Sequence, residues 1–595
     1  MLPFHASRRL IGANLFFAST GAVLETQGVT VGEPLLAGWH ARAQRARSRL
    51  GWSMPAAVAR RHGGGASLAL AAPCDQLMLA TEVNEWALCA ALSEGDCARA
   101  TQLEQLLLAA ALESATDLAA VLPPVLEEAA AFARFAQLAA RESRAGLMAV
   151  LAGAAARGLP HLLDDEVLTL GAGAGARDFG LGELPPAAAI PWQQLGDIPT
   201  ALVTGSNGKT TTVRLLAACA RAQGWPTAYC CTDGVFLDRE RLAEGDYSGP
   251  AGARMALRER RAHAAVLETA RGGILRRGLA ASSADVAVVT NISADHFGEY
   301  GVETLEALAD VKLTVAAVVA RDGLLVLNAD DPLLVERSGR LRDRFGHCPP
   351  IGWFALDDTA APLVAHRARG GATCGVREGR LLLTRAGSGY DLGAIAGMPL
   401  TVAGSASYNV ANLAATALAA VALGVAPQRV GGVFAHFGAE ADDNAGRLMR
   451  FERGGVQILI DYAHNPAGLR GLLTVAEHLR RGSGRLGLLL GHAGNRQDRE
   501  IEALARAAAG FHPALVVIKE NEGHLRGRAA GEVPRILRAE LLRLGFTEAS
   551  LPMCPSELEA ARYALAWAQP GDVLALPVHA AAARAAVLEL LSAAR

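Results

Sequence analysis

A short segment of the chain, residues 202–212, combines glycines, a lysine and threonines in an order suited to phosphate binding. It reads Leu-Val-Thr-Gly-Ser-Asn-Gly-Lys-Thr-Thr-Thr. Gly205 and Gly208 allow backbone N–H groups to turn toward an anion, and Lys209 supplies a point charge for the β- and γ-phosphates of a nucleotide. Thr210 offers a hydroxyl to Mg²⁺, and the positive end of a following helix would face the same anion. These residue types predict a nucleotide phosphate site.

The spacing of this segment differs from that of the common nucleotide-binding loop. In that loop the first glycine lies five residues before the second, and Val203 occupies the corresponding position here. An ordinary glycine turn is the alternative, because the chain contains 64 glycines. The pattern from Val213 to Ala220 predicts a helix directly after the threonines. Strand, glycine loop and helix in this order favour the phosphate site over the turn.

Three further groups of ionisable residues follow the segment. Glu268 lies in Leu-Glu-Thr-Ala-Arg-Gly-Gly, Asp295 and His296 end Thr-Asn-Ile-Ser-Ala-Asp-His, and Lys312 lies sixteen residues after His296. A carboxylate and an imidazole beside a triphosphate would suit Mg²⁺, with phosphate oxygens completing its shell. Taken singly, Glu268 is better explained as a helix cap and His296 as a hydrogen-bonded loop histidine. Their order after a phosphate loop favours one shared site.

Length, charge and cysteine content exclude several classes of protein. A chain of 595 residues with 51% hydrophobic and 5% aromatic residues predicts several domains of packed helices and parallel sheets. A net charge of −2 and a pI of about 6.7 provide no field that would attract nucleic acid or an anionic membrane. The nine cysteines include no Cys-x-x-Cys pair, and no apolar run is long enough to span a membrane. We therefore expect a reduced cytoplasmic protein without structural zinc.

The pattern of the chain divides it into three domains and a connector. Residues 1–180 form the first unit, which contains a long stretch of helical spacing. A proline-rich connector covers residues 181–200, the central domain covers 201–445, and the last domain covers 446–595. We expect an α/β fold: an N-terminal α/β domain, a central parallel-sheet domain with the phosphate loop, and a smaller C-terminal α/β domain.

Short apolar strands alternate with helical stretches in the second and third domains. In the central domain the clearest strands are Val266–Leu267, Val286–Thr290 and Leu324–Asn328. In the last domain they are Val456–Asp461, Leu486–Gly491, Leu515–Lys519 and Val573–Pro577. Ligands bind outside the carboxyl ends of the strands in an open parallel sheet. The polar residues at these strand ends are therefore the candidates for chemistry.

The loop Thr-Gly-Ser-Asn-Gly-Lys-Thr-Thr and the groups after it resemble those of the Mur ligase superfamily, the ATP-dependent amide ligases. The short glycine spacing is typical of that superfamily, and the resemblance extends from about residue 200 to the C-terminus. It implies a central P-loop ATPase domain and a C-terminal Rossmann-like domain that closes over it. Longer phrases are similar, more narrowly, to the C-terminal half of the cyanophycin synthetases within this superfamily.

These longer phrases occur in the same order as in that group. They are Thr232-Asp233-Gly234, Gly245-Asp246-Tyr247-Ser248-Gly249-Pro250, residues 267–276, residues 289–296, Asn328-Ala-Asp-Asp331, residues 461–469, Asn495-Arg-Gln-Asp498, Arg526-Gly-Arg528 and Gly531-Glu532. Ordered phrases of this length are far more specific than a single loop.

The resemblance implies roles around a bound nucleotide. The ATP-binding positions would be Thr204, Gly205, Asn207, Gly208, Lys209, Thr210, Thr211, Asn409, Asn412, Arg447 and Asp461. The catalytic positions would be Lys209, Glu268, His296 and Lys312, and the Mg²⁺ positions Thr210, Glu268, His296 and Lys312, with two ions expected. Many relatives carry a carbamylated lysine where Lys312 stands, on a helix that we expect from Val302 to Arg321. A solvated helix lysine is the alternative.

The amino-acid end of the site would be built by the C-terminal domain. Its substrate-binding candidates are His464, Asn465, Arg496, Asp498, Arg526, Arg528 and Glu532. Arginine binds a substrate carboxylate through two parallel hydrogen bonds, and a substrate guanidinium or ammonium needs a carboxylate such as Asp498 or Glu532. Solvated surface charges are the alternative for Arg526 and Arg528.

The chain departs from the resemblance in one large respect. Cyanophycin synthetases carry an ATP-grasp domain, which adds aspartate to the backbone, between an N-terminal domain and the Mur-like half. Here about thirty residues separate Gly173 from Thr204, which leaves no room for such a domain between them. Residues 1–160, with Gly12-Ala-Asn-Leu15 near the start, resemble the N-terminal domain more weakly.

The resulting hypothesis is an ATP-dependent amide ligase that works through an acyl phosphate. It would join an amino acid, with arginine the first candidate, to a carboxylate of an aspartate-containing peptide or polymer. The alternatives are a Mur-type ligase acting on another acceptor (a peptide, a polyglutamate or a cell-wall precursor) and a non-catalytic scaffold for a separate ATP-grasp protein. ATP and Mg²⁺ are the expected cofactors and a homo-oligomer the expected assembly, while nucleic acid and membrane are not expected partners.

Overall fold

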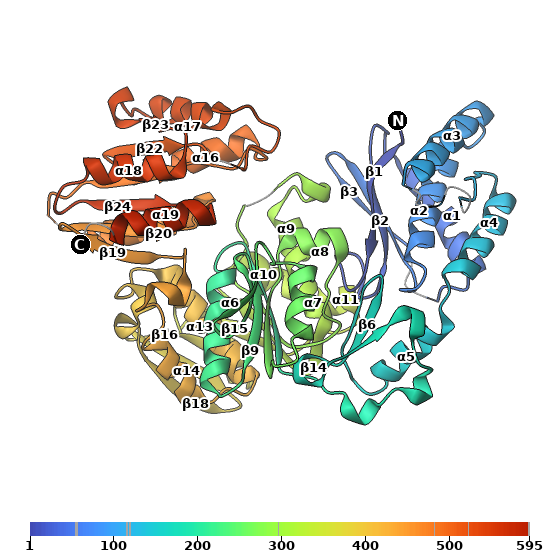
Figure 1. Ribbon diagram of the computed structural model, residues 1–595, viewed down its shortest axis with the longest axis horizontal. Coiled ribbons are helices and arrows are strands. Elements are labelled where there is room, and N and C mark those ends of the chain that lie inside the picture. Colours follow the sequence, from blue (N-terminus) through green and yellow to red (C-terminus); the bar gives the residue numbers. More distant parts are fainter. Residues whose placement is uncertain are drawn as a thin grey trace.

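The computed structural model describes residues 1–53, 57–114, 117, 121–294, 297–480, 482–521 and 523–592. Within these residues the strands form four sheets. The N-terminal and C-terminal bodies lie on opposite sides of a central one (Figure 1). The architecture is α/β, as the sequence predicts.

An antiparallel sheet and four helices make the N-terminal body. The sheet has the order β1 (Phe4–Leu10), β2 (Gly21–Thr26), β4 (Gly65–Ala71) and β3 (Val58–His62). The helices are α1 (Glu33–Arg49), α2 (Leu77–Leu92), α3 (Cys97–Ser114) and α4 (Glu128–Glu142), on the side away from the central domain (Figure 1). Trp39, Trp86 and Phe135 are buried in the core that these elements share. Strands β1 and β4 contact the central domain.

A small subdomain and a connector join this body to the central domain. Helix α5 (Ala145–Ala155) packs against an antiparallel sheet of β5 (His161–Leu163), β6 (Val167–Leu170) and β7 (Arg177–Gly180). The 3₁₀ turns Leu181–Glu183, Ala187–Ala189 and Trp192–Gln194 follow, and β8 begins at Thr200. The chain thus enters the first central strand without a further domain between the two.

An eleven-stranded sheet forms the central domain. Its order is β11-β10-β9-β12-β8-β13-β14-β15-β16-β17-β18. The middle strands are parallel: β9 (Thr227–Cys231), β12 (Ala264–Glu268), β8 (Thr200–Thr204), β13 (Ala284–Val289), β14 (Val319–Asn328), β15 (Ile351–Phe354) and β16 (Ala372–Arg377). Antiparallel strands extend both edges: β10 (Gly234–Leu237), β11 (Glu240–Glu244), β17 (Arg380–Arg385) and β18 (Ser388–Ala394). The parallel sheet that the sequence predicts therefore forms the middle of the observed one.

Helices cover both faces of this sheet, because successive side chains of a strand point to opposite faces. Along β8, Ala201 and Val203 pack with α6 (Lys209–Ala222) and α13 (Ser407–Ala422), whereas Leu202 packs with the opposite layer. That layer contains α7 (Pro250–Arg258), α8 (Arg271–Arg277) and α9 (Leu305–Lys312). Further helices of the domain are α10 (Pro332–Ser338), α11 (Leu341–Phe345), α12 (Ala361–Ala368) and α14 (Pro427–Phe434).

The prediction of one helix from Val302 to Arg321 is wrong in its second half. Helix α9 ends at Lys312, a 3₁₀ turn covers Leu313–Val318, and β14 begins at Val319. Strand β14 pairs in parallel with β13, and β-branched residues such as Val319 suit this pleated, buried position. Sheet pairing outweighs the helical spacing of this stretch. Lys312 consequently lies at the end of a short helix.

The C-terminal domain is a smaller sheet between two layers of helices. Its order is β19 (Met449–Arg453), β20 (Val456–Asp461), β24 (Val573–Pro577), β21 (Leu486–Leu490), β22 (Leu515–Lys519) and β23 (Met553–Cys554); β19 is antiparallel to β20 and the others are parallel. Helices α15 (Pro466–Leu479), α16 (Asp498–Ala509) and α17 (Glu532–Arg543) cover one face, and α18 (Glu557–Trp567) and α19 (Ala581–Ser592) cover the other. This doubly wound arrangement confirms the predicted Rossmann-like domain.

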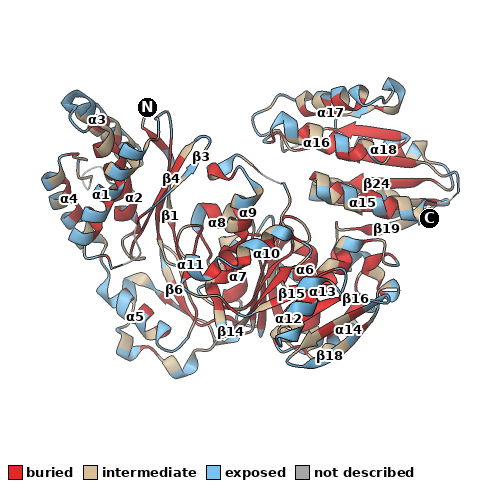
Figure 2. Ribbon diagram, turned by 180° about the vertical axis from the view of Figure 1, so that it is seen from behind, coloured by how far each residue is buried: buried red, intermediate tan, exposed pale blue. Residues whose placement is uncertain are grey.

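The parallel strands of both domains are buried, whereas the outer faces of the helices are exposed (Figure 2). The carboxyl ends of β8, β12 and β20 open onto one space between the two domains. Within the described part of the chain, no helix is both long enough and apolar enough to cross a bilayer. The polar strand ends of the central and C-terminal domains therefore face each other.

Candidate active site

The phosphate loop joins β8 to α6, and neither of its glycines has room for a side chain. Gly205 has φ +146°, and a Cβ there would lie 1.8 Å from Thr290 Oγ1. Gly208 has φ +84°, and a Cβ there would lie 2.3 Å from Asn412 Oδ1. Because α6 begins at Lys209, the loop backbone lies at the positive end of a helix. These surroundings suit an anion and are not those of an ordinary surface turn.

Two lysines converge on this loop from different elements. Lys209 Nζ donates hydrogen bonds to the carbonyl oxygens of Gly205 and Ser206, both at 3.0 Å. Lys312 Nζ donates to the Gly205 carbonyl at 2.8 Å, and this lysine is 4% exposed. Lys312 is therefore not a solvated helix lysine. Only three of the 57 lysine and arginine residues of the chain are lysines, and two of the three meet at this carbonyl.

The Glu268 carboxylate lies buried at the end of β12 and accepts hydrogen bonds from two threonines. Thr210 Oγ1 donates to Oε2 at 2.8 Å, and Thr232 Oγ1 donates to Oε1 at 3.1 Å. Hydroxyl and carboxylate oxygens are ligands that Mg²⁺ prefers, so this group fits a magnesium ion whose shell phosphate oxygens would complete. The predicted ligand His296, with its neighbour Asp295, lies outside the described residues. Among the residues that the structure does describe, no three His, Cys, Asp or Glu side chains form a group that could hold a metal ion.

A cavity of about 310 Å³ opens beside the phosphate loop, between the central and C-terminal domains. Of the predicted nucleotide-binding residues, it is lined by Asn207, Gly208, Lys209, Thr210, Thr211, Asn409, Asn412, Arg447 and Asp461. Thr204 is instead buried at the end of β8, and Gly205 lines a second, larger cavity. Asn412 Nδ2 donates to Asn409 Oδ1 at 3.1 Å, which fixes both amides at the wall. Most of the predicted nucleotide residues thus surround one space.

The C-terminal domain closes the far side of this cavity. Asp461 ends β20 and accepts a hydrogen bond from Leu448 N at 2.7 Å, and burial raises the pKa of its carboxyl. Asn465 caps α15 by accepting from Gly468 N at 2.8 Å, and its Nδ2 donates to Asn207 Oδ1 at 2.9 Å. This last bond joins the C-terminal domain directly to the phosphate loop.

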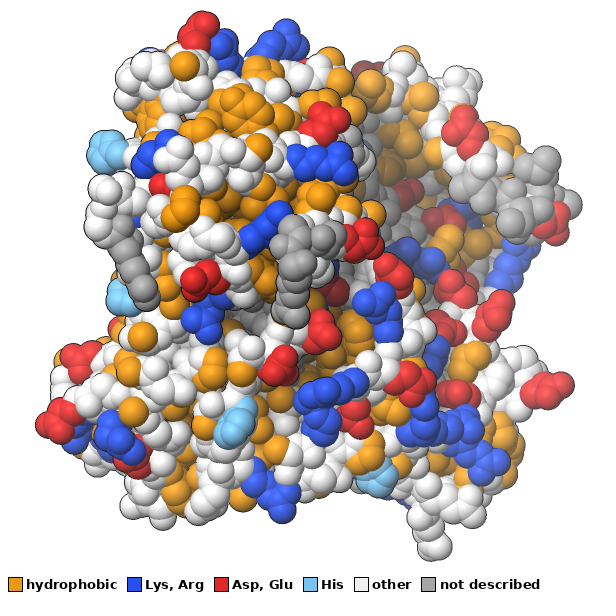
Figure 3. Space-filling view, turned by 60° about the vertical axis from the view of Figure 1, so that its left-hand side comes forward, with side chains coloured by type: hydrophobic (Ala, Val, Ile, Leu, Met, Phe, Trp, Pro, Cys, Tyr) orange, Lys and Arg blue, Asp and Glu red, His pale blue; other side chains and the backbone are white. Residues whose placement is uncertain are grey.

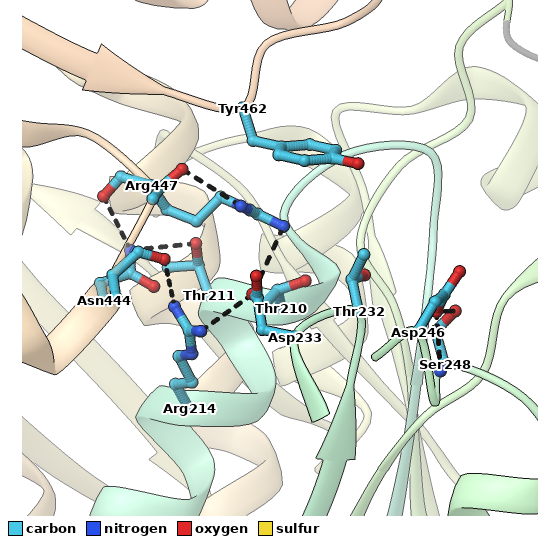
Figure 4. Close-up of polar contacts among 12 residues, drawn as sticks. Thr210, Thr211, Arg214, Thr232, Asp233, Asp246, Ser248, Asn444, Arg447 and Tyr462 are labelled. Atoms are coloured by element: carbon cyan, nitrogen blue, oxygen red, sulfur yellow. Dashed lines mark hydrogen bonds and ion pairs between the residues drawn. The ribbon is translucent and has the colours of Figure 1, made fainter. Parts of the chain in front are cut away.

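Asp233, which follows β9, has three arginine neighbours, of which Figure 4 shows Arg214 and Arg447. Its oxygens lie 2.9 Å from Arg214, 3.0 Å from Arg584 and 3.8 Å from Arg447. Burial alone would raise the pKa of Asp233, but Arg447, Arg214 and Arg584 outweigh burial and hold the pKa below its usual value. The phrase Thr232-Asp233-Gly234 marks the residue in the sequence, but nothing local indicates its distant partners.

The larger cavity, of about 1150 Å³, continues from the first and reaches the N-terminal body at His5. The molecule is hollowed between its C-terminal domain and the remaining domains in the space-filling view (Figure 3). The basic residues of the lining are Lys209, Arg254, Arg271, Arg276, Arg277, Lys312, Arg496 and Arg526, and the acidic ones are Asp246, Glu268 and Glu299. Positive charge predominates in this described lining, which favours an anionic ligand.

The two cavities meet at residues that line both. These are Lys209, Thr232, Glu268, Tyr462 and His464. A nucleotide in the first cavity and an anionic substrate in the second would approach each other here. His464 Nδ1 lies 3.1 Å from the Tyr462 carbonyl, which orients the imidazole at this junction. The arrangement suits transfer of a phosphoryl group between two bound ligands.

The predicted amino-acid-binding residues divide into two sets. Arg496, which is buried, and Arg526 line the larger cavity. Arg528 lies outside that lining, and its guanidinium is 2.6 Å from Asp498 Oδ1 and 2.6 Å from Glu532 Oε1. Arg528 already pairs with both carboxylates, so a substrate guanidinium at Asp498 or Glu532 would have to displace it.

Arg528 also stabilises the loop that carries Arg496. Its Nε donates to the Gly494 carbonyl at 2.9 Å, and its Nη2 donates to the Arg496 carbonyl at 2.8 Å. The alternative of a fully solvated arginine is therefore wrong for Arg528. Arg528 would therefore contribute to substrate binding indirectly, by holding the backbone of Arg496 in place.

Residues that the sequence patterns do not single out complete the wall of the larger cavity. They include His492, Asn521, His524 and His579. Behind His579 lies the third lysine of the chain: Lys519 Nζ is 3.1 Å from His579 Nδ1 and also pairs with Glu557. Burial lowers the pKa of His579 to about 4, so its ring is neutral at physiological pH. The position of Lys519 at the end of a predicted strand is the signal that identifies it as a candidate.

Comparison with known proteins identifies two segments of the chain. Residues 203–347 match the family described as Mur ligase middle domain, and residues 446–576 match the one described as Mur ligase, glutamate ligase domain. The cyanophycin synthetase of Crocosphaera subtropica is 34% identical over 65% of this chain and 43% of that protein. The cyanophycin synthetase of Geminocystis herdmanii is 36% identical over 57% of this chain and 38% of that protein.

Another relative, a diaminopimelate ligase, is less similar but is covered over more of its length. The UDP-N-acetylmuramoyl-L-alanyl-D-glutamate–2,6-diaminopimelate ligase of Geobacter metallireducens is 28% identical over 66% of this chain and 75% of that protein. The solved pseudomurein peptide ligase type C from Methanothermus fervidus is 17% identical and covers 67% of this chain and 82% of that one, with a TM-score of 0.45. The chain spans less than half the length of the two cyanophycin synthetases.

Proposed function

We propose that the chain, which carries the middle and C-terminal domains of the Mur ligase family, is an ATP-dependent amide ligase. The observation that supports this proposal most strongly is the meeting of the two cavities at Lys209, Glu268 and His464. One cavity is built around a phosphate loop, and the other is lined mainly by cations. A ligase needs such a junction, because it must bring an anionic acceptor to the γ-phosphate of ATP.

The proposed reaction has two steps. An oxygen of the acceptor carboxylate forms a bond to the γ-phosphorus while the bond to ADP breaks, which yields an acyl phosphate. The amine nitrogen of the incoming amino acid then forms a bond to the acyl carbon, inorganic phosphate leaves, and the amine gives up a proton. Lys209 and the positive end of α6 would offset the negative charge of the transferred group. Enclosure between the domains would exclude water, which otherwise hydrolyses an acyl phosphate.

Thr210 and Glu268 are the described residues that would hold Mg²⁺, and His296 is the further ligand that the sequence predicts. Bound Mg²⁺ would neutralise phosphate charge and orient the phosphates. We propose two ions, with Lys312 as a ligand after its amine has combined with CO₂ and lost a proton to give a carbamate. A plain ammonium would repel Mg²⁺, whereas a carbamate supplies an oxygen donor to the same place beside Gly205.

The proposed acceptor is an aspartate-containing peptide or polymer, and arginine is the first candidate for the incoming amino acid. The excess of cations in the larger cavity supports an acceptor with several carboxylates. Arg496 and Arg526 would bind the α-carboxylate of the amino acid. The choice of arginine depends on the resemblance to cyanophycin synthetases. A separate ATP-grasp protein that supplies the acceptor, and a homo-oligomeric assembly, complete the proposal.

Two alternatives remain beside it. One is a Mur-type ligase that acts on another acceptor, such as a peptide, a polyglutamate or a cell-wall precursor. The other is a non-catalytic scaffold for the ATP-grasp partner. The arrangement of the partly buried Lys209 and the buried Lys312 and Glu268 at one loop weighs against the scaffold, because a binding subunit has no need of it.

Phosphate release from ATP by the purified protein distinguishes these functions. Amino acids are screened in pairs with aspartate-containing, glutamate-containing and cell-wall acceptors. Turnover that requires both an amino acid and an aspartate-containing acceptor is the expected result. Turnover with a different acceptor indicates the other ligase, and ATP binding without turnover in any pair indicates the scaffold.

A further inference from the structure

The three arginines around Asp233 come from different parts of the molecule. Arg214 lies on α6 of the central domain, Arg447 lies two residues before the start of β19, and Arg584 lies on α19. Asp233 itself follows β9 of the central sheet (Figure 4). One carboxylate therefore joins the central domain to two separate segments of the C-terminal domain.

The contacts of Asp233 with these arginines are unequal. Arg214 Nη2 donates to Oδ2 at 2.9 Å, and Arg584 Nη2 donates to Oδ1 at 3.0 Å. Arg447 Nη2 is 3.8 Å from Oδ2, which is too far for a hydrogen bond, and its guanidinium lies 4.1 Å from the centre of the Tyr462 ring. Each carboxylate oxygen thus has one close partner, and Arg447 is attracted to Asp233 without being hydrogen-bonded to it.

Among these four residues, Arg447 is the one that lines the nucleotide cavity. Three guanidinium groups against one carboxylate leave net positive charge beside the cavity, which a bound triphosphate would offset. Arg447 could move to a phosphate without breaking a hydrogen bond to Asp233, because its guanidinium donates instead to the neighbouring Gly446 carbonyl, at 3.1 Å. Arg214 and Arg584 would keep their hydrogen bonds to Asp233 during that movement.

The backbone that presents Arg447 is held by the same cluster. Arg214 Nη1 donates to the Ala445 carbonyl at 2.7 Å. Gly446 has φ +74°, and a Cβ there would lie 2.8 Å from Arg584 Nη1. Both arginines that hydrogen-bond to Asp233 therefore also contact the turn from which Arg447 projects.

We infer that Asp233 is a positioning residue that fixes Arg447 at the nucleotide cavity and couples nucleotide binding to the seating of the C-terminal domain on the central domain. This role rests on the proposed function, because Arg447 acts only if ATP binds in the cavity. Without the Asp233 carboxylate, Arg447 and α19 lose their common anchor while the cavity becomes more positive. Binding of ATP and turnover of ATP should therefore respond differently to its loss.

The test compares Asp233→Asn, Arg584→Gln and the double variant in the full chain. Neither residue lines the nucleotide cavity, so neither substitution removes a side chain from the wall that ATP would contact. We expect each single variant to lower kcat for phosphate release by about ten- to a hundredfold, since Arg447 is displaced. The dissociation constant of ATP for Asp233→Asn, measured by calorimetry, should fall or stay within about twofold, because loss of the carboxylate makes the cavity more positive. The double variant should lose no more of its kcat than the single variant with the lower kcat, because both substitutions disrupt the same anchor.

Asp358→Asn is the matched control for a buried carboxylate with two arginine partners. Asp358 is 1% exposed and pairs with Arg367 and Arg377 inside the central domain, outside the lining of both cavities. Loss of one partner of a buried ion pair destabilises a fold, so this variant should lower Tm while leaving kcat within about twofold of wild type. Comparison at equal fractions of folded protein then removes the effect of stability.

Wild-type kcat in Asp233→Asn would overturn the inference. An ATP dissociation constant that rises enough to account for the lost activity would overturn it as well, as would an equal loss of kcat in Asp358→Asn.

If wild-type protein shows no turnover with any acceptor, the proposed function fails, and the coupling is measured by small-angle scattering. ATP with Mg²⁺ should then reduce the radius of gyration of wild type but not of Asp233→Asn, and any other outcome contradicts the role of Asp233.

Discussion

The two ends of the cleft between the central and C-terminal domains are built in different ways. At the phosphate end, one loop and the helix after it supply most of the groups, and two lysines bind the single carbonyl of Gly205. At the amino-acid end, the lining residues that the C-terminal domain supplies come from separate loops, around residues 491–496, Asn521, His524 to Arg526, and His579. Backbone geometry determines the first end, whereas pairing among long side chains determines the second.

This difference indicates which substitutions each end tolerates. A side chain at Gly205 or Gly208 would collide with its neighbours, so the phosphate loop has almost no freedom to change. At the other end, Asp498 and Glu532 are partly exposed and pair with Arg528 outside the cavity. Exposed ion pairs contribute little to stability. Changes at the phosphate end should therefore abolish chemistry, and changes at the amino-acid end should alter substrate affinity.

The largest effect is expected from Lys209→Ala at the phosphate end. Without the charge of Lys209, the transferred phosphoryl group loses a direct electrostatic partner, and kcat should fall by about a hundredfold or more. Phosphate release at saturating ATP and both substrates measures the loss, with Lys209→Arg as the variant that keeps the charge. Near-normal amide formation by Lys209→Ala would show that this loop is not the phosphate site.

The second-largest effect is expected from Lys312→Ala, because Lys312 is proposed as a metal ligand and not as a direct phosphate contact. Loss of a carbamate oxygen should lower kcat by roughly tenfold or more, and acetate should restore part of the activity by filling the vacated space. Acetate should have no such effect on Lys209→Ala, which serves as the control. Full activity of Lys312→Ala would exclude a role for this lysine at the phosphate end.

Arg496→Ala and Arg528→Ala form a pair that tests the division at the amino-acid end. Loss of a charge-assisted bond to the substrate carboxylate should raise KM for the amino acid by about ten- to a hundredfold in Arg496→Ala. In Arg528→Ala the rise should be about two- to fivefold, because only the support of the Arg496 loop is lost. Steady-state kinetics with the amino acid as varied substrate decide this. A larger effect in Arg528→Ala would reverse the roles of the two arginines.

The smallest effect is expected from Asp498→Asn. Asp498 pairs with Arg528 at an exposed position, so its charge should change neither Tm noticeably nor KM for the amino acid by more than about twofold. Thermal unfolding and the same kinetic assay measure both quantities. An amino acid that no longer binds to Asp498→Asn would restore the interpretation of Asp498 as a substrate carboxylate.

The phosphate end could be predicted from the sequence because its signals are local. The glycines, Lys209 and Thr210 lie within a few residues, and Glu268 directly ends a recognisable strand. The helix that the sequence predicts around Lys312 is too long, yet Lys312 Nζ still reaches the loop. Local sequence patterns and strand ends are thus sufficient to predict site residues where the backbone of one loop forms most of the site.

The remaining features depend on contacts between residues far apart in the chain. Asp233 contacts Arg447 and Arg584 across the boundary between the central and C-terminal domains. No spacing in the sequence predicts these contacts. The pairing of Arg528 with Asp498 and Glu532 is similar, because any of these charges could equally have faced a substrate. The antiparallel edges of the central sheet are decided by pairing with neighbouring strands and not by an apolar pattern.

Transfer of ¹⁸O from the acceptor to phosphate tests the central claim most directly. In an acyl-phosphate mechanism, an oxygen of the acceptor carboxylate leaves with the phosphate when the amide forms. An aspartate-containing peptide labelled with ¹⁸O in its carboxylates should therefore release phosphate that carries one labelled oxygen for each amide, in the presence of ATP, Mg²⁺ and the amino acid. Unlabelled phosphate, or phosphate release that does not require the acceptor, would contradict an amide ligase at this site.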